Sequence, residues 1–171
     1  MTASFVVASL SSDHDRQAFS CGVEPLDRYL QTQATQDVRR RIANCFVATP
    51  ANSNIIAGYY TFSAASVAML DLPSDTAKRL PRYPVVPAAL IGRLAIDRRY
   101  RGRGLGAALL FDAIARAARA DTAIFAILVD AKDDSAAAFY RHHGFQPFAV
   151  RPLNLFLPIG TALKLLENRE A

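Results

Sequence analysis

Residues 88–120 read AALIGRLAIDRRYRGRGLGAALLFDAIARAARA, and this stretch decides the fold class. Its first part, residues 88–96, is apolar enough to form a buried central strand. The turn that follows, Arg101–Gly106, consists mainly of glycine and arginine. Residues 104–120 then carry leucine and isoleucine at the spacing of an amphipathic helix. A strand, a glycine turn and a helix in this order predict part of a mixed α/β sheet.

The turn Arg101–Gly106 has the properties of an anion-binding site. Glycines let the backbone approach a ligand closely, and the free amides at a helix start carry partial positive charge. A pyrophosphate group fits such a site. A P-loop would need Lys-Ser/Thr after its last glycine, where this chain has Ala107 and Ala108. A Rossmann fingerprint would need a different glycine spacing in the first βαβ unit. The alternative is a glycine turn that only exposes its arginines.

The remaining sequence extends the α/β pattern over one domain, residues 1–171, with no repeat or low-complexity linker. A helix is expected at residues 24–40, where Leu26, Tyr29 and Leu30 form an apolar stripe at the spacing i, i+3, i+4. Two more helices are expected, one at residues 104–120 and one that is capped by Asp133, Asp134 or Ser135 and stops at Gly144. The proline-rich residues 73–87 are expected to form a loop. Further strands are expected at residues 5–8, 45–48, 55–62, 123–129, 145–150 and 162–166.

The composition restricts the classes of partner. The chain has 171 residues and a net charge of +5, and lysine occurs only at Lys78, Lys132 and Lys164, so arginine supplies most of the positive charge. Arginine matches phosphate oxygens in pairs, which makes a polyanionic partner plausible. Two cysteines without a CxxC pair and three histidines argue against a metal site. Without a secretory signal or a long apolar run, we expect a cytoplasmic protein with reduced thiols that does not contact a membrane.

With these motifs in place, the sequence resembles the GCN5-related N-acetyltransferase (GNAT) family. The acetyl-CoA motif of that family, Q/R-x-x-G-x-G/A, matches Arg101, Gly104 and Gly106. The resemblance implies a GNAT fold, with a mostly antiparallel central sheet flanked by helices, and acetyl-CoA as co-substrate. By the same resemblance, the residues that bind the cofactor are Leu94, Ala95, Ile96, Arg101, Gly102, Arg103, Gly104, Leu105 and Gly106. Tyr140 corresponds to the tyrosine that protonates the departing thiolate, and its alternative role is packing against the sheet.

Motifs along nearly the whole chain resemble one branch of that family, the acetyltransferase toxins of bacterial toxin–antitoxin pairs. They include LPRYP at residues 80–84, GRLAID at residues 92–97 and VDA at residues 129–131. This closer resemblance implies acetylation of the amino group on aminoacyl-tRNA, a ribbon-helix-helix antitoxin as partner, and a homodimer. Arginines give salt-dependent phosphate contacts. Candidate tRNA contacts are Arg39, Arg40, Arg41, Arg79, Arg82 and Arg93.

The acceptor amine can also be considered from its acidity. The central strand contains no glutamate, and Asp97 and Asp130 are the carboxylates nearest to the motifs. An α-amine has a pKa near 8, so a useful fraction is neutral at pH 7 without a strong base, whereas lysine has a pKa of about 10.4. This difference favours an α-amine as acceptor. Two other functions remain as alternatives to acetylation of aminoacyl-tRNA. One is an acetyltransferase for a small amine or a protein N-terminus, and the other is a non-catalytic module that binds acetyl-CoA or the antitoxin.

Overall fold

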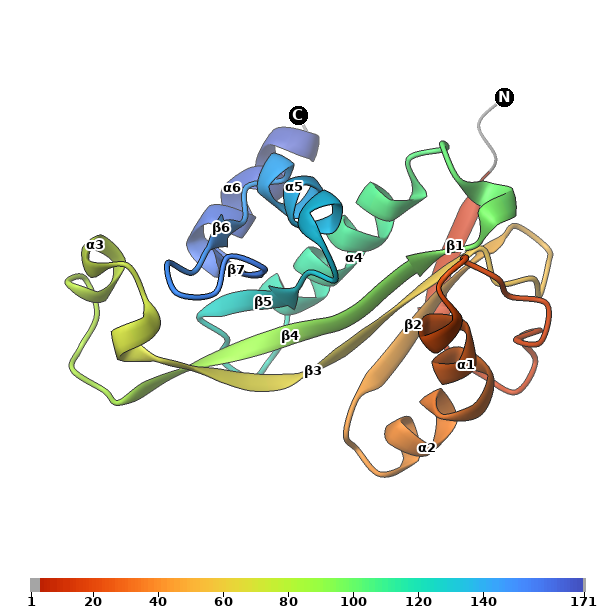
Figure 1. Cartoon of the computed structure of the whole chain (residues 1–171), viewed down its shortest axis with the longest axis horizontal. Coiled ribbons are helices and arrows are strands. Elements are labelled where there is room, and N and C mark those ends of the chain that lie inside the picture. Colours follow the sequence, from red (N-terminus) through yellow and green to blue (C-terminus); the bar gives the residue numbers. More distant parts are fainter. Residues whose placement is uncertain (1–3, 171) are drawn as a thin grey trace. The chain divides into compact units, whose positions relative to one another are not determined.

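The computed structural model describes residues 4–170 and has a mixed α/β fold (Figure 1). Its sheet has seven strands in the order β1-β2-β3-β4-β5-β7-β6. They are β1 (Phe5–Ser9), β2 (Asn44–Pro50), β3 (Gly58–Ala68), β4 (Val85–Ile96), β5 (Ala126–Asp130), β6 (Gln146–Pro147) and β7 (Asn154–Pro158). The registers pair β4 with β5 in parallel, and β1–β2, β2–β3, β5–β7 and β6–β7 in antiparallel fashion. This arrangement confirms the predicted mixed, mostly antiparallel sheet.

Helices occupy most of the connections between these strands, and one more helix follows the last strand. They are α1 (Glu24–Thr32), α2 (Ala34–Arg39), α3 (Ser74–Ala77), α4 (Leu105–Ala118), α5 (Asp134–His142) and α6 (Ile159–Glu170), with short 3-10 turns η1 (Met69–Asp71) and η2 (Arg98–Tyr100). Helix α2 contacts β2, and α5 and α6 both contact β7. Each of these three helices therefore packs against a strand of the sheet.

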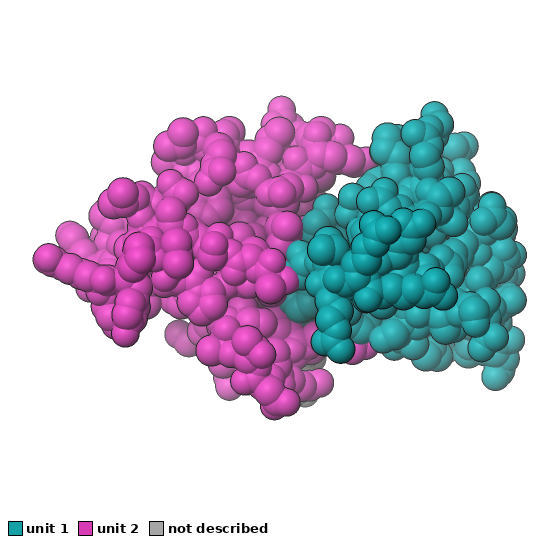
Figure 2. Space-filling view, turned by 90° about the horizontal axis from the view of Figure 1, so that it is seen from below, with its two compact units in different colours: residues 1–63, 92–113 teal, residues 64–91, 114–171 magenta. Residues whose placement is uncertain are grey.

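The chain divides into two compact units, shown in different colours in Figure 2. Unit 1 contains residues 1–63 and 92–113, and unit 2 contains residues 64–91 and 114–171. Because these boundaries fall inside β3, β4 and α4, each of the three elements contributes to both units. The single domain expected from the sequence stays a prediction.

The helix predicted for residues 24–40 is interrupted. It ends at Thr32, and Gln33 has the non-helical dihedrals φ −121° and ψ −31° before α2 begins. The Thr32 hydroxyl donates a hydrogen bond to the Arg28 carbonyl at 2.7 Å, a contact that bends helices. The apolar spacing that suggested one helix is kept within α1, where Tyr29 and Leu30 are buried.

The strand predicted at residues 162–166 is wrong, because these residues belong to α6 and the last strand is β7. A short apolar run fits a strand or a buried helix equally well, and only Ala162 in this run is fully buried. Of the strand expected at residues 145–150, only Gln146–Pro147 pairs. The expected loop at residues 73–87 includes α3 and the start of β4.

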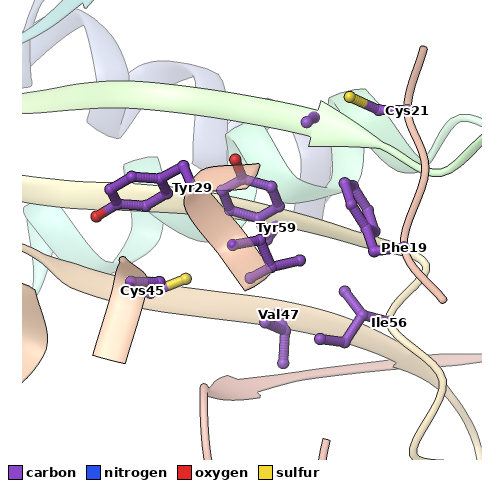
Figure 3. Packing of buried hydrophobic residues seen from close by; sticks show 10 residues of the cluster. Phe19, Cys21, Tyr29, Cys45, Val47, Ile56 and Tyr59 are labelled. Atoms are coloured by element: carbon purple, nitrogen blue, oxygen red, sulfur yellow. The ribbon is translucent and has the colours of Figure 1, made fainter. Parts of the chain in front are cut away.

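Unit 1 has its own hydrophobic core, in which side chains from α1, β2 and β3 pack together (Figure 3). Its buried members are Phe19, Cys21, Tyr29, Leu30, Ala34, Cys45, Val47, Ile56, Tyr59 and Ala95. Two phenols in this core satisfy their hydroxyls inside the protein. Tyr59 donates to the Leu26 carbonyl at 2.6 Å, and Tyr29 donates to the Asp37 carboxylate at 2.8 Å. The core thus joins α1 to β3 and to α2 through polar as well as apolar contacts.

Unit 2 has a separate core that spans β3, β4 and β7. Its buried members are Val67, Leu72, Val86, Ala88, Phe148 and Phe156. The rings of Phe148 and Phe156 lie with centroids 4.9 Å apart. Leu80, in the segment between α3 and β4, packs against this core. That contact holds the segment between α3 and β4 against unit 2.

The unit 1 core predicts a loss of stability at alkaline pH. Burial raises the pKa of the Cys45 thiol from 9.0 to about 12, and burial also raises the pKa values of Tyr29 and Tyr59 above 10. The folded state therefore keeps protons that the unfolded state releases, so stability is complete below pH 9 and falls above it. We expect the free energy of unfolding to decrease by about 3 kcal/mol or more between pH 8.5 and 11.

Urea denaturation across this pH range measures the effect. The variant Cys45→Ala lacks the thiol, so its stability should decline less steeply between pH 9 and 10 than that of the wild type. An unfolding midpoint that stays constant to pH 11 would contradict the assignment of these buried groups.

Candidate functional site

The glycine turn lies between η2 and α4 in unit 1. Gly102 has φ +75° and Gly104 has φ +74°, in the left-handed region that favours glycine. A Cβ atom placed on either residue would meet no other atom within 4 Å. Both glycines are exposed. The backbone of the turn is therefore accessible to a ligand on the side toward which a Cβ atom of either residue would point.

Helix α4 begins directly after this turn. The Gly104 carbonyl accepts the first helical hydrogen bond, from the Ala108 amide at 3.1 Å. The amides of the first turn, at Leu105, Gly106 and Ala107, have no acceptor within an α-helix and carry the positive end of its dipole. Leu105 is buried and anchors this end of the helix. The predicted arrangement of a glycine turn followed by free amides is thus present.

Arg101 and Arg103 are directed to protein partners. The Arg101 guanidinium donates a hydrogen bond to the Cys21 carbonyl. The Arg103 guanidinium lies 5.3 Å from the centroid of the Tyr100 ring. Arg101 therefore fastens the turn to the segment before α1.

Asp97 is a structural carboxylate that the sequence did not distinguish from a catalytic one. It is buried, and it accepts hydrogen bonds from the Ser20 amide at 3.0 Å and from the Arg99 amide and Nε, each at 2.9 Å. Burial alone would raise its pKa, but the hydrogen bonds from Arg99 and Ser20 outweigh burial and lower the pKa below its usual value. Asp97 therefore joins the segment at Ser20 to η2 and is a poor proton acceptor.

The end of β4 contains Leu94, Ala95 and Ile96, which the resemblance assigns to the pantetheine arm. The register with β5 covers only Ala88–Ile91, whereas β4 continues to Ile96. Packing around this end is close, because a Cβ on Gly58 would lie 2.9 Å from Ile96 Cδ1 and 3.1 Å from the Ala95 carbonyl oxygen. Gly58 thus lets β3 approach the strand end without displacing it.

Tyr140 lies on α5 in unit 2. Asp133 caps this helix by accepting a hydrogen bond from the Ala136 amide at 2.8 Å, as one of the three caps considered from the sequence. The Tyr140 side chain is 7% exposed, and its ring packs edge-on against Phe139 and Phe145, with centroids 5.2 Å and 5.6 Å away. Helix α5 therefore holds the ring in one orientation.

The hydroxyl of Tyr140 has a different environment from its ring. The hydroxyl makes no hydrogen bond to another residue of the described chain. Within residues 4–170, every side-chain N or O atom that is shielded from solvent has a hydrogen-bond partner. The hydroxyl must therefore be accessible to solvent. Burial of the residue raises its pKa to about 12, so the phenol is protonated throughout the neutral range. The Tyr140 hydroxyl is therefore a protonated, solvent-accessible group on a ring that is held by its neighbours.

The candidate RNA-binding arginines occupy three places. Arg39, Arg40 and Arg41 are exposed at the end of α2, and Arg79 and Arg82 are exposed between α3 and β4. Arg93 differs from them, because it is half-buried on β4 and its guanidinium carbon lies 3.6 Å from the centroid of the Tyr29 ring. None of these arginines forms an ion pair with a carboxylate in the described part of the chain.

The stacking of Arg93 on Tyr29 was missed by sequence reasoning. Tyr29 is 64 positions away in sequence and appeared only as a member of the apolar stripe of a helix. Its hydroxyl donates to Asp37, which fixes the ring under the guanidinium. Arg93 is thus a cation held in one position by an aromatic surface, and it forms no ion pair with a carboxylate of the described residues.

Within residues 4–170, no group of three or more His, Cys, Asp or Glu side chains is placed to hold a metal ion. In the same part of the chain, every helix is too short or too polar to cross a bilayer.

Comparison with known families and structures gives a consistent result. The family model described as an acetyltransferase (GNAT) domain matches residues 42–147. A tRNA-acetylating toxin of Mycobacterium tuberculosis is 38% identical over 159 residues, covering 92% of this chain and 93% of the relative.

Two solved structures agree over most of the chain. AtaT complexed with acetyl-methionyl-tRNAfMet superposes with a TM-score of 0.87 at 30% identity, over 96% of this chain and 99% of the other. A tyrosine-to-phenylalanine mutant of AtaT, bound to the C-terminus of the antitoxin AtaR and acetyl-CoA, superposes with a TM-score of 0.80 at 26% identity, over 95% and 98%. Because the family model spans more than half of the sequence and a relative aligns along nearly all of it, the chain belongs to the GNAT family and is an acetyl-CoA-dependent acetyltransferase.

Proposed function

We propose that this acetyltransferase transfers an acetyl group from acetyl-CoA to the α-amine of aminoacyl-tRNA and thereby blocks translation. The observation that carries the proposal is similarity over nearly the whole chain to a tRNA-acetylating toxin, together with an open glycine turn at the start of α4. The six candidate RNA-binding arginines, none paired with a carboxylate among the described residues, agree with a polyanionic acceptor.

In this proposal the cofactor is held mainly by backbone groups. The amides from Gly104 to Gly106 bind the pyrophosphate, with Gly102 and Arg103 shaping the turn and Leu105 anchoring it. Arg101 acts through its hydrogen bond to the Cys21 carbonyl, which holds the turn in place. The backbone of Leu94, Ala95 and Ile96 bonds the pantetheine arm, because β4 extends beyond its register with β5.

Tyr140 is proposed as the general acid. Acetyl-CoA supplies an activated acetyl thioester, whose carbonyl carbon the neutral amine attacks. A C–N bond forms, the C–S bond breaks, and the Tyr140 hydroxyl gives its proton to the departing sulfur. The proton lost by the amine passes to solvent, since the lowered pKa of Asp97 makes that carboxylate a poor base, and the Tyr140 phenolate regains a proton from solvent, which closes the cycle. An α-amine with a pKa near 8 is partly neutral at pH 7 and needs no strong base.

The arginines supply the proposed contacts to tRNA phosphates, and Arg93 is the one whose position is fixed. Replacing it with methionine, Arg93→Met, keeps a side chain of similar length over the Tyr29 ring and removes the charge. We expect kcat/KM for aminoacyl-tRNA to fall about tenfold, and the salt dependence of RNA binding to weaken by about one unit of slope. Steady-state kinetics and binding titrations at several salt concentrations measure both effects.

Arg28 provides the matched control for this prediction. It is also in unit 1, but it is exposed and already forms an ion pair with Glu24 one helical turn away. The substitution Arg28→Met should leave RNA binding and its salt dependence close to those of the wild type. Equal losses in the two variants would indicate that only net charge matters and that Arg93 has no specific contact.

The partners expected from the sequence remain part of this proposal. We propose a ribbon-helix-helix antitoxin that binds the toxin, in line with the related toxin bound to the C-terminus of an antitoxin, and a homodimer as the free form.

The function is tested by incubating the purified protein with total charged tRNA and labelled acetyl-CoA. We expect the label on the amino acid esterified to tRNA, and digestion should release an N-acetyl aminoacyl-adenosine. Transfer to a small amine or a protein N-terminus, with none to charged tRNA, would replace the proposed acceptor. Absence of transfer to any acceptor would favour a module that only binds acetyl-CoA or the antitoxin.

A further inference from the structure

Tyr83 stands out among the surface residues of unit 2. It lies between α3 and β4, and its side chain is 62% exposed. Among the large hydrophobic side chains that are exposed in the described chain, it is the only aromatic one. Its ring makes no aromatic or cation–π contact, and its hydroxyl makes no hydrogen bond, with any other described residue. The packing of the protein therefore does not account for a large aromatic ring at this position.

The backbone around Tyr83 is held on both sides. Leu80 packs against the unit 2 core, and Val86 is a buried member of it. The Tyr83 amide donates to the Pro81 carbonyl at 2.9 Å, and the Pro84 carbonyl accepts from the Met69 amide at 3.0 Å. Proline also restricts the backbone at positions 81 and 84. The segment thus presents the ring from an anchored turn, which reduces the conformational entropy lost on binding.

The charges of the segment that carries this ring are mostly positive. Lys78, Arg79 and Arg82 are exposed and form no ion pair within the described residues, and Asp75 is the only carboxylate between residues 74 and 84. An exposed aromatic ring and exposed cations on one short segment are a combination that suits single-stranded nucleic acid. The cations attract the phosphates, and the ring stacks on a base.

We infer that Tyr83 stacks on an unpaired base at the 3′ end of the acceptor tRNA. The inference rests on the proposed function and adds a residue that contacts a base to the arginines that contact phosphates. An aminoacyl group is attached to the single-stranded end of tRNA, so a ring that stacks on a base there helps to position the amine. Tyr83 binds substrate and takes no part in the transfer itself.

A tryptophan reporter tests the contact directly. The chain contains no tryptophan, so Tyr83→Trp introduces a single indole that can also stack on a base. We expect its fluorescence to be quenched when an RNA hairpin ending in unpaired CCA is added, and to change far less with the same hairpin lacking that end. Equal quenching by the two hairpins, or none by either, would overturn the inference.

Affinity measurements provide the second test. Tyr83→Leu removes the aromatic face, and we expect it to raise the Kd for the CCA-ended hairpin about 5- to 100-fold. Tyr83→Phe keeps the face and should rescue binding. The KM for aminoacyl-tRNA should rise in parallel in Tyr83→Leu, while kcat at saturating RNA stays near the wild-type value.

Leu70 offers a matched control in the same unit. It is 97% exposed, and Leu70→Ala also removes exposed apolar surface without removing an aromatic ring. RNA affinity should be unchanged in Leu70→Ala. An unchanged Kd in Tyr83→Leu, with antitoxin binding lost instead, would overturn the inference in favour of a protein-binding role.

Different results would contradict the role of Tyr83 and the proposed function. If the wild type acetylates aminoacyl-tRNA but Tyr83→Leu does so with unchanged KM, only the stacking inference is wrong. If the wild type acetylates no charged tRNA, the proposed function is wrong, whatever the fluorescence of the tryptophan variant shows.

Discussion

Tyr140→Phe is expected to lower kcat about 100- to 10,000-fold, the range that general acid catalysis usually contributes. The substitution removes only the hydroxyl, while the ring keeps its contacts with Phe139 and Phe145. Because the hydroxyl makes no hydrogen bond within the described chain, thermal stability should be unchanged. The Kd for acetyl-CoA should also be close to that of the wild type. Kinetics, calorimetric titration and thermal unfolding measure the three quantities.

Tyr59→Phe is the matched control for the loss of a hydroxyl. Tyr59 is buried in the unit 1 core and donates to the Leu26 carbonyl at 2.6 Å. Removing this hydrogen bond should cost about 1 kcal/mol of stability or more, and should leave kcat nearly unchanged. Full activity in Tyr140→Phe would remove Tyr140 from the mechanism, whereas a reduced Tm in that variant would point to a structural role.

The pH dependence of kcat gives further evidence on the same residue. Because burial raises the pKa of Tyr140 to about 12, the phenol stays protonated well above neutral pH. Ionisation of an ordinary tyrosine would reduce activity near pH 10. In the range where the protein remains folded, kcat should therefore show no alkaline decrease from this group.

Gly104→Val is expected to produce the second large effect, on cofactor binding. Valine is strongly disfavoured at φ +74°, and its side chain would occupy the open space beside the first amides of α4. We expect the KM for acetyl-CoA to rise roughly 10- to 100-fold, the equivalent of one or two hydrogen bonds to a charged group. Steady-state kinetics with acetyl-CoA as the varied substrate measure the change.

Gly160→Val is the control for Gly104→Val, because it also introduces a valine at a glycine that faces open space. A Cβ on Gly160 meets no atom within 4 Å, as at Gly104, but Gly160 does not have a positive φ. Gly160→Val should leave the KM for acetyl-CoA unchanged. If Gly104→Val also leaves it unchanged, the turn does not bind the pyrophosphate.

The sequence predicted the features that depend on local chemistry. The glycine turn, the following helix and a cap of α5 at Asp133, Asp134 or Ser135 could be predicted from residues close together in the chain, and Asp133 is the residue that caps. The fold class followed from the order of strands and helices, supported by the family resemblance. These features arise from backbone conformation and hydrogen bonds between near neighbours, which residue type largely determines.

Features that depend on tertiary contacts were not predictable in the same way. The break at Gln33 and the helical state of residues 162–166 depend on which side chains the rest of the chain buries. Asp97 was one of the two carboxylates nearest to the motifs, and hydrogen bonds from the distant Ser20 amide and from Arg99 give it a structural role. Arg93 differs from the other candidate arginines because Tyr29, which is distant in sequence, lies under its guanidinium.

A crystal structure of the protein with bound acetyl-CoA is the most direct test of the central claim. The account predicts that the pyrophosphate oxygens accept hydrogen bonds from the amides of Gly104, Leu105 and Gly106, and that the Tyr140 hydroxyl lies within hydrogen-bond distance of the thioester sulfur. Density for the cofactor elsewhere, or a Tyr140 hydroxyl directed away from the sulfur, would contradict it.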